Sequence, residues 1–437
     1  MEEELHLKEN GGYSWVICAV CMLLIICTMG TCTNAFSVYL PYIEKHGLNA
    51  SEGSLILSVR CFFSLIGMFL VPLFYRKISQ RLGMTLTCLM AAASFFLYSV
   101  ASNAWMFYSA AAVAGMAYGL GSLIPVSVVL NRWFATGRGF AIGLCTAGTG
   151  ISTICFSPLI TMITEHFNLN TAFLCEGAFI LLSAVLIWFL LRDTPEETGR
   201  KPYQKGNEIL KTKAVNHYNI SGLQWPLIIS AILMLGGVST AAPGHFPVLF
   251  ASEGYSVYTA SAAVSVFGVL LALGKILYGR FADRFGGYLP SVGFLLFLAT
   301  GCFFSCIGDG MNLLPMFTAV VLMGIGFPMA TVGLSVLSGD FADSDHYMKT
   351  LKWFQIAYAG GGMLFSSAPG FLYEYYHSYT VSYGIFFLMT VFIILSLVVI
   401  YRQRANALEG AAVSQKASLP APRFRTRHSR AQSYIRN

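Results

Sequence analysis

The amino-acid sequence predicts an all-α membrane protein with twelve transmembrane helices in two six-helix bundles. Of its 437 residues, 56% are hydrophobic and only 11% are charged, and the mean hydropathy is +0.65. Soluble domains carry about 25% charged residues, so this composition is typical of a chain embedded in lipid. Twelve apolar stretches are long enough to cross a bilayer, which takes about 18 or more residues. One long polar segment separates the sixth stretch from the seventh.

The predicted spans are continuous apolar runs, and several exceed about 20 residues, so we expect them to tilt or bend. Prolines inside or near the ends of the runs remove a backbone donor and can kink the helices. The spans are predicted at residues 14–41, 52–75, 83–101, 104–130, 138–164, 170–191, 224–251, 257–282, 287–307, 312–338, 346–375 and 379–402.

The polar segment after the sixth span divides the chain into two halves. It is charged and rich in turn-forming residues, which is typical of a linker. The last residues are polar and basic and show no apolar period, so we expect disorder there. The predicted organisation is an N-terminal six-helix bundle (1–191), a cytoplasmic linker (192–223), a C-terminal six-helix bundle (224–402) and a disordered basic cytoplasmic tail (403–437).

The positions of lysine and arginine predict that both termini are cytoplasmic. Of the 27 such residues, only Lys45 falls in an outer loop, while Arg60 and Lys275 fall within spans. All the others fall in segments on one side, and cytoplasmic loops carry such an excess. The net charge of +7 therefore reflects a basic cytoplasmic edge and not a surface for nucleic acid.

The sequence offers no pattern of an enzyme, a metal site or a cofactor site. The eleven cysteines all fall in apolar stretches and are typical of small core residues. No HExxH, Ser/His/Asp or paired-carboxylate arrangement is present. A non-transporting membrane sensor would normally carry a folded soluble domain, and the predicted loops are too short for one.

Two cations inside predicted spans indicate a binding site. Lys275 lies in "VFGVLLALGKILYGRFADRFGG" (266–287). This run is unlike a phosphate-binding loop, because Ile276 follows the lysine where Ser or Thr is required. A charge in the bilayer costs several kcal/mol unless it faces water or a partner. An anionic substrate would supply that partner for Lys275 and for Arg60; snorkelling to an interface, or for Arg60 pairing at an outer gate, is the alternative.

Two similar turns follow the second and the eighth spans. "GRFADRFGGY" contains Gly279, Asp283, Arg284 and Gly286, and "RKISQRLGMT" is a fainter copy in the first half. Aligning the two copies puts Gln80 on Asp283, so the first copy lacks the acid. The second copy resembles the loop signature of the major facilitator superfamily. The resemblance implies a conformational latch formed by these four residues, with the glycine allowing close helix approach.

Further stretches resemble the oxalate–formate antiporter and monocarboxylate transporter group of that superfamily. They are "NRWFATGRGFAIGLCTAGTGIS" (131–152), "NGGYSW" (10–15), "RDTPEETG" after the sixth span and "APGFLYEYY" near the end of the eleventh. The resemblance implies the major facilitator fold and a secondary transporter. In this group a cation four residues before the motif glycine binds the substrate carboxylate, and Lys275 stands at that position.

Two departures from the group bear on the substrate and on protons. Oxalate-type members carry a second cation in the middle of the eleventh span, where this chain has Gln355, Tyr358 and Ala359. A dicarboxylate held between two cations is therefore not expected. Animal-type proton-coupled members carry an aspartate four residues before the cation of the eighth span. Here Leu271 stands there, so proton coupling through that pair is unavailable.

Weaker candidates are polar groups within the spans. His245 matches a histidine of the seventh span in the group and could bind substrate or a proton. The side chains that could donate hydrogen bonds to a carboxylate are Tyr118, Tyr39, Tyr358 and Asn34. For each of these, packing is the alternative. Glu176, near the outer end of a peripheral helix, is expected to snorkel toward the interface.

The sequence thus predicts a secondary active transporter, not an enzyme, that moves a small organic anion by alternating access. A monocarboxylate is the expected substrate, carried by proton symport or by anion exchange. The alternative is a transporter for a neutral or cationic small solute or a drug-like compound. We expect a monomeric multi-pass protein of the cell (inner) membrane, with no metal, cofactor or nucleic-acid partner.

Overall fold

The computed structural model describes residues 11–136, 138–204, 220, 222–307, 312–343 and 346–417. These residues form helices joined by short connections, and none of them forms a strand beyond one isolated bridge between Phe134 and Tyr203. Eleven helical segments among them are long and apolar enough to cross a membrane. The prediction of an all-α membrane protein is confirmed.

The first half of the chain begins with a helix whose middle is irregular. After α1 (Gly11–Ile25) the helix widens into a π-helical segment, η1 (Ile26–Asn34), and then tightens into a 3₁₀ segment, η2 (Ala35–Tyr39). Changes of helix type within one span often mark functional sites. The remaining helices of this half are α2 (Leu40–Lys45), α3 (Ala50–Lys77), α4 (Gln80–Ser99), α5 (Ala104–Leu120), α6 (Leu123–Trp133), α7 (Arg138–His166) and α8 (Leu169–Leu190).

In the second half, three predicted spans are each divided into shorter helices. The divisions fall where Pro247, Pro328 and Pro369 occupy the first turn of a new helix. Proline fits there because the first turn lacks intrahelical partners for its N–H groups. The helices are α9 (Gln224–Gly244), α10 (Phe246–Ser252), α11 (Val257–Phe285), α12 (Tyr288–Ile307), α13 (Leu313–Gly326), α14 (Pro328–Thr331), α15 (Gly333–Phe341), α16 (Tyr347–Phe365), α17 (Ala368–Tyr376) and α18 (Thr380–Ala417).

The predicted eleventh span (346–375) is not among the eleven helical segments that are long and apolar enough to cross a membrane. It forms α16 and α17, which are separated at Ser366 and Ser367, and α16 carries Lys349 and Lys352 in its first turns. A second difference lies in the tail, where α18 continues past the predicted span to Ala417. Residues 403–417 are rich in alanine and other good helix formers, which explains why the helix extends beyond the apolar run. The rest of the tail lies outside the described residues.

The first part of the predicted linker packs against the first half. Asp193 accepts hydrogen bonds from the backbone N–H groups of Gln80 and Arg81 at the start of α4. Tyr203 exchanges backbone hydrogen bonds with Trp133 and Ala135. Residues 193–204 thus form part of the surface of the first bundle.

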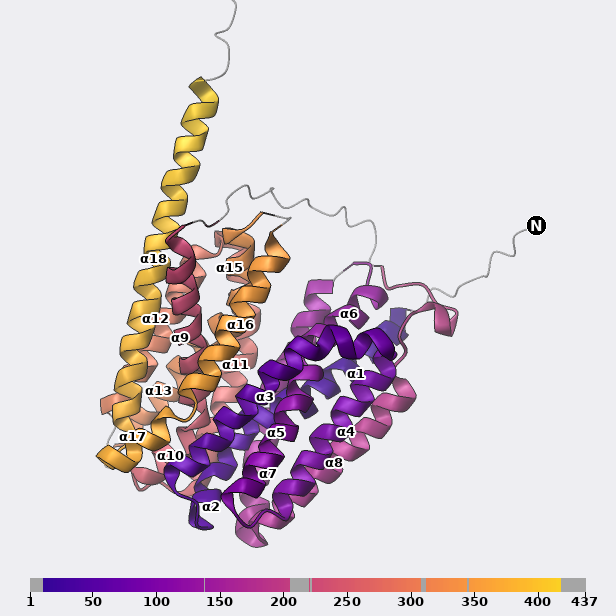
Figure 1. Cartoon of the computed structure of the whole chain (residues 1–437), viewed down its shortest axis with the longest axis vertical. Coiled ribbons are helices and arrows are strands. Elements are labelled where there is room, and N and C mark those ends of the chain that lie inside the picture. Colours follow the sequence, from indigo (N-terminus) through magenta and orange to yellow (C-terminus); the bar gives the residue numbers. More distant parts are fainter. Residues whose placement is uncertain are drawn as a thin grey trace, which may run out of the picture.

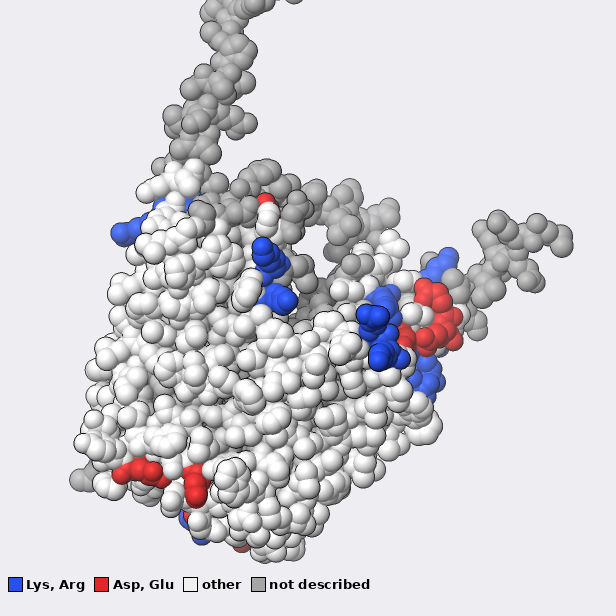
Figure 2. All heavy atoms as spheres, viewed as in Figure 1, with Lys and Arg blue, Asp and Glu red and all other residues white. Residues whose placement is uncertain are grey.

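The helices of the two halves form two groups that meet at one end and diverge at the other. In Figure 1, helices α1 to α8 lie on one side and α9 to α18 on the other, and they approach each other near α2, α10 and α17. At the opposite end, α6 and α15 stand apart, and Figure 2 shows the surface hollowed between the two groups. Most of the visible lysines and arginines gather at this divergent end. On the orientation predicted from the sequence, the hollow opens toward the cytoplasm.

Small residues set the closest helix contacts. A Cβ atom added at Gly115 in α5 would collide with the backbone of Arg60 in α3, and one at Gly119 would collide with Ser64. Glycine at these two positions therefore allows α3 and α5 to approach closely. Gly143 is different, because a Cβ atom there would meet nothing within 4 Å. Gly143 is therefore not a position of close helix approach.

Candidate functional site

Lys275 lies where α11 of the second half packs against α7 of the first half. Its ammonium group donates to the Thr149 hydroxyl over 2.9 Å and to the Thr146 carbonyl over 3.3 Å. The side chain is only 9% exposed. Neither ion pair found among the described residues, His346–Asp343 and Arg404–Asp340, includes it. Lys275 is thus a buried cation whose described partners are neutral and belong to the other half of the molecule.

Two facing glycines bring Thr149 and Lys275 within reach. A Cβ atom at Gly150 would lie 2.6 Å from the carbonyl oxygen of Gly268, and one at Gly268 would lie 2.8 Å from Cβ of Thr153. Only glycine at both positions lets α7 and α11 approach this closely. The same contact places Lys275, which lies two turns after Gly268 in α11, beside the Thr149 hydroxyl of α7.

Arg60 lies within the first bundle and holds the irregular part of the first span. Its guanidinium donates to the carbonyl oxygen of Cys32 in η1 over 2.8 Å and lies 5.8 Å from the ring centre of Phe36. The residue is 4% exposed. A carbonyl oxygen has two lone pairs, so it can accept this bond in addition to one within the helix. Asn34, the last residue of η1, comes two residues after Cys32 and is half-buried.

Tyr118 and Tyr358 come together at the interface between the halves. Tyr118 of α5 and Tyr358 of α16 are half-buried and lie close enough to each other and to Cys61 of α3 to interact electrostatically. The Tyr358 hydroxyl accepts a hydrogen bond from Ser239 of α9 over 2.8 Å. Its own proton remains available for another acceptor. No contact described for Lys275 joins it to either tyrosine.

Tyr39 and Glu176 form a buried pair. The Tyr39 hydroxyl at the end of η2 donates to Glu176 Oε2 in α8 over 2.7 Å, and Tyr39 is 0% exposed. Glu176 is 3% exposed, so the expectation that it snorkels to the interface is wrong. Glu176 is buried because its side of α8 packs toward the first span, where the Tyr39 hydroxyl donates to it. In this structure Tyr39 is thus bonded within the protein.

His245 lies at the end where the two halves meet, which faces outward on the orientation predicted from the sequence. Its ring is 0% exposed, and Nε2 lies 2.8 Å from the Ser54 hydroxyl of α3 while Nδ1 lies 2.9 Å from the Ala241 carbonyl. A proton on Nδ1 satisfies both contacts with a neutral ring. His245 therefore connects the two halves.

Further contacts join the halves at the same end. The Ser51 hydroxyl donates to Glu374 over 2.6 Å, and the Tyr379 hydroxyl donates to Glu44 over 3.1 Å. Deeper in the molecule, the sulfur of Cys61 lies 3.7 Å from the hydroxyl oxygen of Ser366. We call these contacts, with Ser54–His245, the outer closure. These contacts are made by single polar side chains scattered along the chain, so no sequence pattern indicates which of them pair.

The predicted latch is only partly described. Gly279, half-buried in α11, has nothing within 4 Å of an added Cβ, so the expected close approach at this glycine is absent. The divergence of the two halves at this end explains the open space. Arg284 is exposed with its guanidinium 5.2 Å from the ring centre of Phe285, and Gly286 has a φ of +76°, which suits glycine. The side chain of Asp283 lies outside the described residues.

In the first half, the turn before α4 lacks the acid of the motif, and the segment after α8 supplies a carboxylate there. Gln80 stands where the second half has Asp283, and Asp193 instead supplies the carboxylate to the N–H groups at the start of α4. An anion at this position complements the positive end of the helix dipole. The substitute comes from the "RDTPEETG" segment that follows α8.

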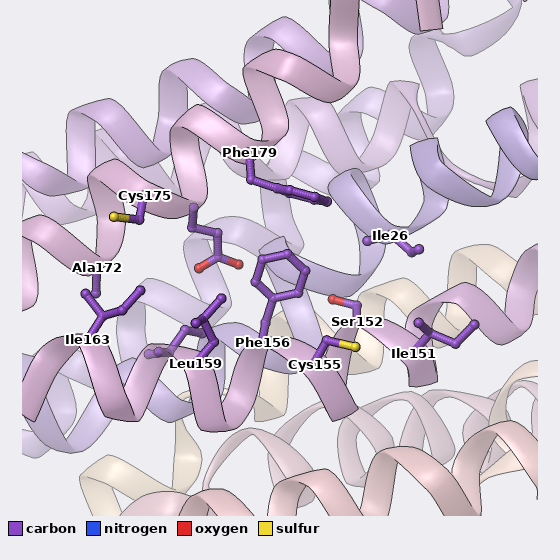
Figure 3. Close-up of a pocket in the computed structure, with 12 residues that line it drawn as sticks. Ile26, Ile151, Ser152, Cys155, Phe156, Leu159, Ile163, Ala172, Cys175 and Phe179 are labelled. Carbon is purple, nitrogen blue, oxygen red and sulfur yellow. The ribbon is translucent and has the colours of Figure 1, made fainter. Parts of the chain in front are cut away.

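A pocket of about 330 Å³ lies between α7, α8 and η1. In Figure 3, Phe156, Leu159 and Cys155 of α7 face Cys175 and Phe179 of α8 across it. Glu176 and Ser152 also line it. Among the described residues, no three metal-ligating side chains form a cluster.

Comparisons with known proteins agree with this architecture. The family model described as Major Facilitator Superfamily matches residues 21–366 and 254–434. Monocarboxylate transporter 12 of Rattus norvegicus is 24% identical over 305 residues, which cover 63% of this chain and 62% of that protein. The probable transporter MCH2 of Saccharomyces cerevisiae is 24% identical over 304 residues, 66% of this chain and 60% of the relative. The matched region thus spans less than two thirds of these relatives.

Solved structures share the fold at lower identity. The nucleoside transporter NupG has a TM-score of 0.69 at 12% identity, covering 89% of this chain and 99% of the neighbour. A bacterial homolog of the human lysosomal transporter Spinster, inward-facing and unoccupied, has a TM-score of 0.63 at 13% identity and covers 89% and 96%. At this identity the likeness concerns the fold.

Proposed function

Because the chain belongs to the Major Facilitator Superfamily, and is therefore a multi-pass membrane transporter of small molecules and not an enzyme, we propose that its substrate is a small monocarboxylate. The observation that carries the proposal is Lys275, a buried cation without a described carboxylate partner at the contact between the two halves. The relatives named monocarboxylate transporters support the same class. We also propose that the boundaries 1–191, 192–223, 224–402 and 403–437 separate the bundles, linker and tail.

The geometry supports one carboxylate better than two. Lys275 holds its ammonium against neutral oxygens, while the Arg60 guanidinium already donates to the Cys32 carbonyl in η1. A carboxylate at Lys275 would replace a neutral acceptor by a charged one, which strengthens the hydrogen bond. Tyr118 and Tyr358, at the interface of the halves, are the proposed additional donors.

Alternating access would then follow from occupancy at the interface. In the arrangement described, the outer closure joins the halves at one end and the hollow separates them at the other. A substrate that neutralises Lys275 would lower the cost of burying this charge while the inner ends come together. The latch residues Gly279, Asp283, Arg284 and Gly286 are proposed to meet the opposite half in that inward-closed state. We propose a monomer in the cell membrane, with proton symport or anion exchange as the coupling.

Replacing Lys275 by glutamine tests the proposal. We expect uptake of radiolabelled L-lactate, pyruvate and acetate into proteoliposomes, for whichever of them the wild type carries, to fall by about tenfold or more. A charge-assisted hydrogen bond contributes about 1.5–3 kcal/mol, and 1.4 kcal/mol corresponds to about a factor of ten. Lys275→Arg should retain part of the uptake.

The matched control is Lys352→Gln, which removes an exposed cation from α16. It should leave uptake close to that of the wild type. Unchanged carboxylate uptake in Lys275→Gln would overturn the assignment. Such a result would favour the alternative substrate class, a neutral or cationic small solute.

A further inference from the structure

Glu176 has one carboxylate oxygen that no partner satisfies. Oε2 accepts the Tyr39 hydroxyl over 2.7 Å, whereas Oε1 is buried and, among the described residues, has no hydrogen-bond partner. The residue is 3% exposed. Buried polar atoms are normally paired, so an unpaired carboxylate oxygen calls for a proton, a water molecule or a ligand.

This carboxylate lies in the wall of the pocket of about 330 Å³ between α7, α8 and η1. Ser152 lines the same pocket, and its buried hydroxyl also has no partner within the described part of the chain. Most of the other lining side chains are apolar, among them Phe156, Leu159 and Phe179 (Figure 3). The space is large enough for water, which needs polar partners of this kind.

Among the described residues, the titratable and charged groups around Glu176 supply no direct counterion. Tyr39 of η2 is its hydrogen-bond donor, and Cys32 of η1 lies within electrostatic range of both Glu176 and Arg60. Arg60 of α3 is committed to the Cys32 carbonyl. The remaining groups are Cys175 on its own helix, Cys155 across the pocket on α7 and Tyr98 of α4, which stacks with Tyr39 on the ring of Phe173.

An ionised carboxylate in these surroundings would cost several kcal/mol, because it is removed from water without a paired cation. Protonation removes this cost and adds an O–H donor for the pocket side. The arrangement described therefore favours the neutral acid.

The pair lies at the end of the irregular part of the first span. Tyr39 ends the irregular stretch formed by η1 and η2, and α2 follows it directly. Glu44 in α2 accepts the hydroxyl of Tyr379 in the outer closure. A change in the bond between Tyr39 and Glu176 would therefore act on the segment that closes the outer end.

We propose that Glu176 is a proton-binding site that couples proton uptake to closure of the outer end. The carboxylate takes one proton from water to form the neutral acid while the outer end closes, and it returns that proton to water when the outer end opens. The role in a transport cycle rests on the proposed function, whereas proton binding does not require any substrate. The site lies in the first half, and none of the contacts described for Lys275 includes Glu176 or Tyr39.

Infrared difference spectroscopy of the purified, substrate-free protein tests proton binding. On titration from acidic to alkaline pH, the wild type should lose a carbonyl-stretch band of a protonated carboxyl group that Glu176→Gln lacks at every pH. Glu165→Gln, which removes an exposed carboxylate from α7, should keep the band. If Glu176→Gln shows the same titrating band as the wild type, the proposal is overturned.

A second variant separates proton binding from folding. Tyr39→Phe removes the donor but keeps the carboxyl group, so the band should persist while the pH at which it disappears shifts. An unshifted band in Tyr39→Phe would contradict the proposed pair. Glutamine at 176 keeps a carbonyl acceptor for Tyr39, which preserves the local hydrogen bond.

Coupling to the outer closure is measured by cross-linking in the absence of substrate. In an S366C background, oxidation joins residue 366 to the native Cys61, whose sulfur lies 3.7 Å from the Ser366 oxygen. Relative to S366C/E176Q, the yield in S366C should fall as the pH rises, because ionisation of Glu176 favours the open outer end. An identical pH profile in both proteins would reject the coupling even if the infrared band is confirmed.

Discussion

The carboxylate of Asp193 lies at the start of α4, where its two oxygens accept the N–H groups of Gln80 and Arg81 over 2.9 and 2.7 Å. The first turn of a helix has unpaired donors and a partial positive charge, so an anion there is stabilising. At the aligned turn in the second half, the acid lies within the motif itself. The two halves thus place an acid near equivalent turns by different routes.

Replacing Asp193 by alanine should lower the stability of the protein by about 1 kcal/mol, because the helix cap and its charge are both lost. The melting temperature of the purified protein in detergent is the measurement. Glu196→Gln is the matched control, since this exposed carboxylate lies three residues along the same segment. Equal melting temperatures for the two variants would contradict the capping role.

Single residues were predictable only where their chemistry is unusual in a bilayer. Lys275 and Arg60 were predicted to need partners because they are cations in apolar runs, and the structure places both of them buried with partners. The identities of those partners, Thr149 and the Cys32 carbonyl, depend on which helix faces which. Glu176 was assigned to the interface because periodicity along α8 does not reveal that Tyr39 lies opposite.

At the scale of the elements, α9 and α16 approach each other through glycines. A Cβ atom at Gly236 would collide with the carbonyl of Tyr358, and one at Gly361 would collide with the carbonyl of Leu233. This contact positions Tyr358 beside Ser239, whose hydroxyl it accepts. The backbone approach and the polar contact at the interface are therefore connected.

Gly361→Ala should lower the melting temperature, because the added methyl group forces the two backbones apart at a cost of about 1–3 kcal/mol. Gly360→Ala is an adjacent control, since a Cβ atom there meets nothing within 4 Å. Gly360→Ala should melt with the wild type. If both variants melt alike, the close approach of α9 and α16 does not stabilise the protein.

The existence of the helices was predictable, but their interruptions were not. Apolar length located the spans, since lipid requires every backbone group to be paired within the segment. The divisions at Pro247, Pro328 and Pro369 fall inside runs that look continuous by hydropathy. The π-helical segment η1 has no sequence pattern of its own, because it depends on packing against Arg60 and α7.

At the scale of the whole molecule, the outer closure joins the two halves while the opposite end is hollow. The sequence predicted two bundles from the polar segment between the sixth and seventh spans. It could not predict which end would be closed, because both ends have similar composition apart from the positive charges. The closure consists of scattered serines, one cysteine, one histidine, one tyrosine and two glutamates.

Oxidation of S366C should stop transport, because a disulfide with Cys61 would hold the outer ends together. Uptake by proteoliposomes should be lost after treatment with an oxidant and restored by a reductant. C61A/S366C, which lacks the native thiol, should be insensitive to the oxidant. Full uptake by oxidised, cross-linked S366C would show that the outer ends need not separate.

The hydroxyl of Thr149 gives Lys275 an acceptor when no substrate is bound. A carrier whose substrate-binding cation has no partner returns slowly without substrate, because the closed state would then bury an uncompensated charge. Here the Thr149 hydroxyl acts as the hydrogen-bond acceptor of Lys275 in place of a substrate oxygen. On the proposed role of Lys275, the neutral Thr149 hydroxyl satisfies this donor but leaves the charge uncompensated, so the carrier is expected to return faster with substrate than without it.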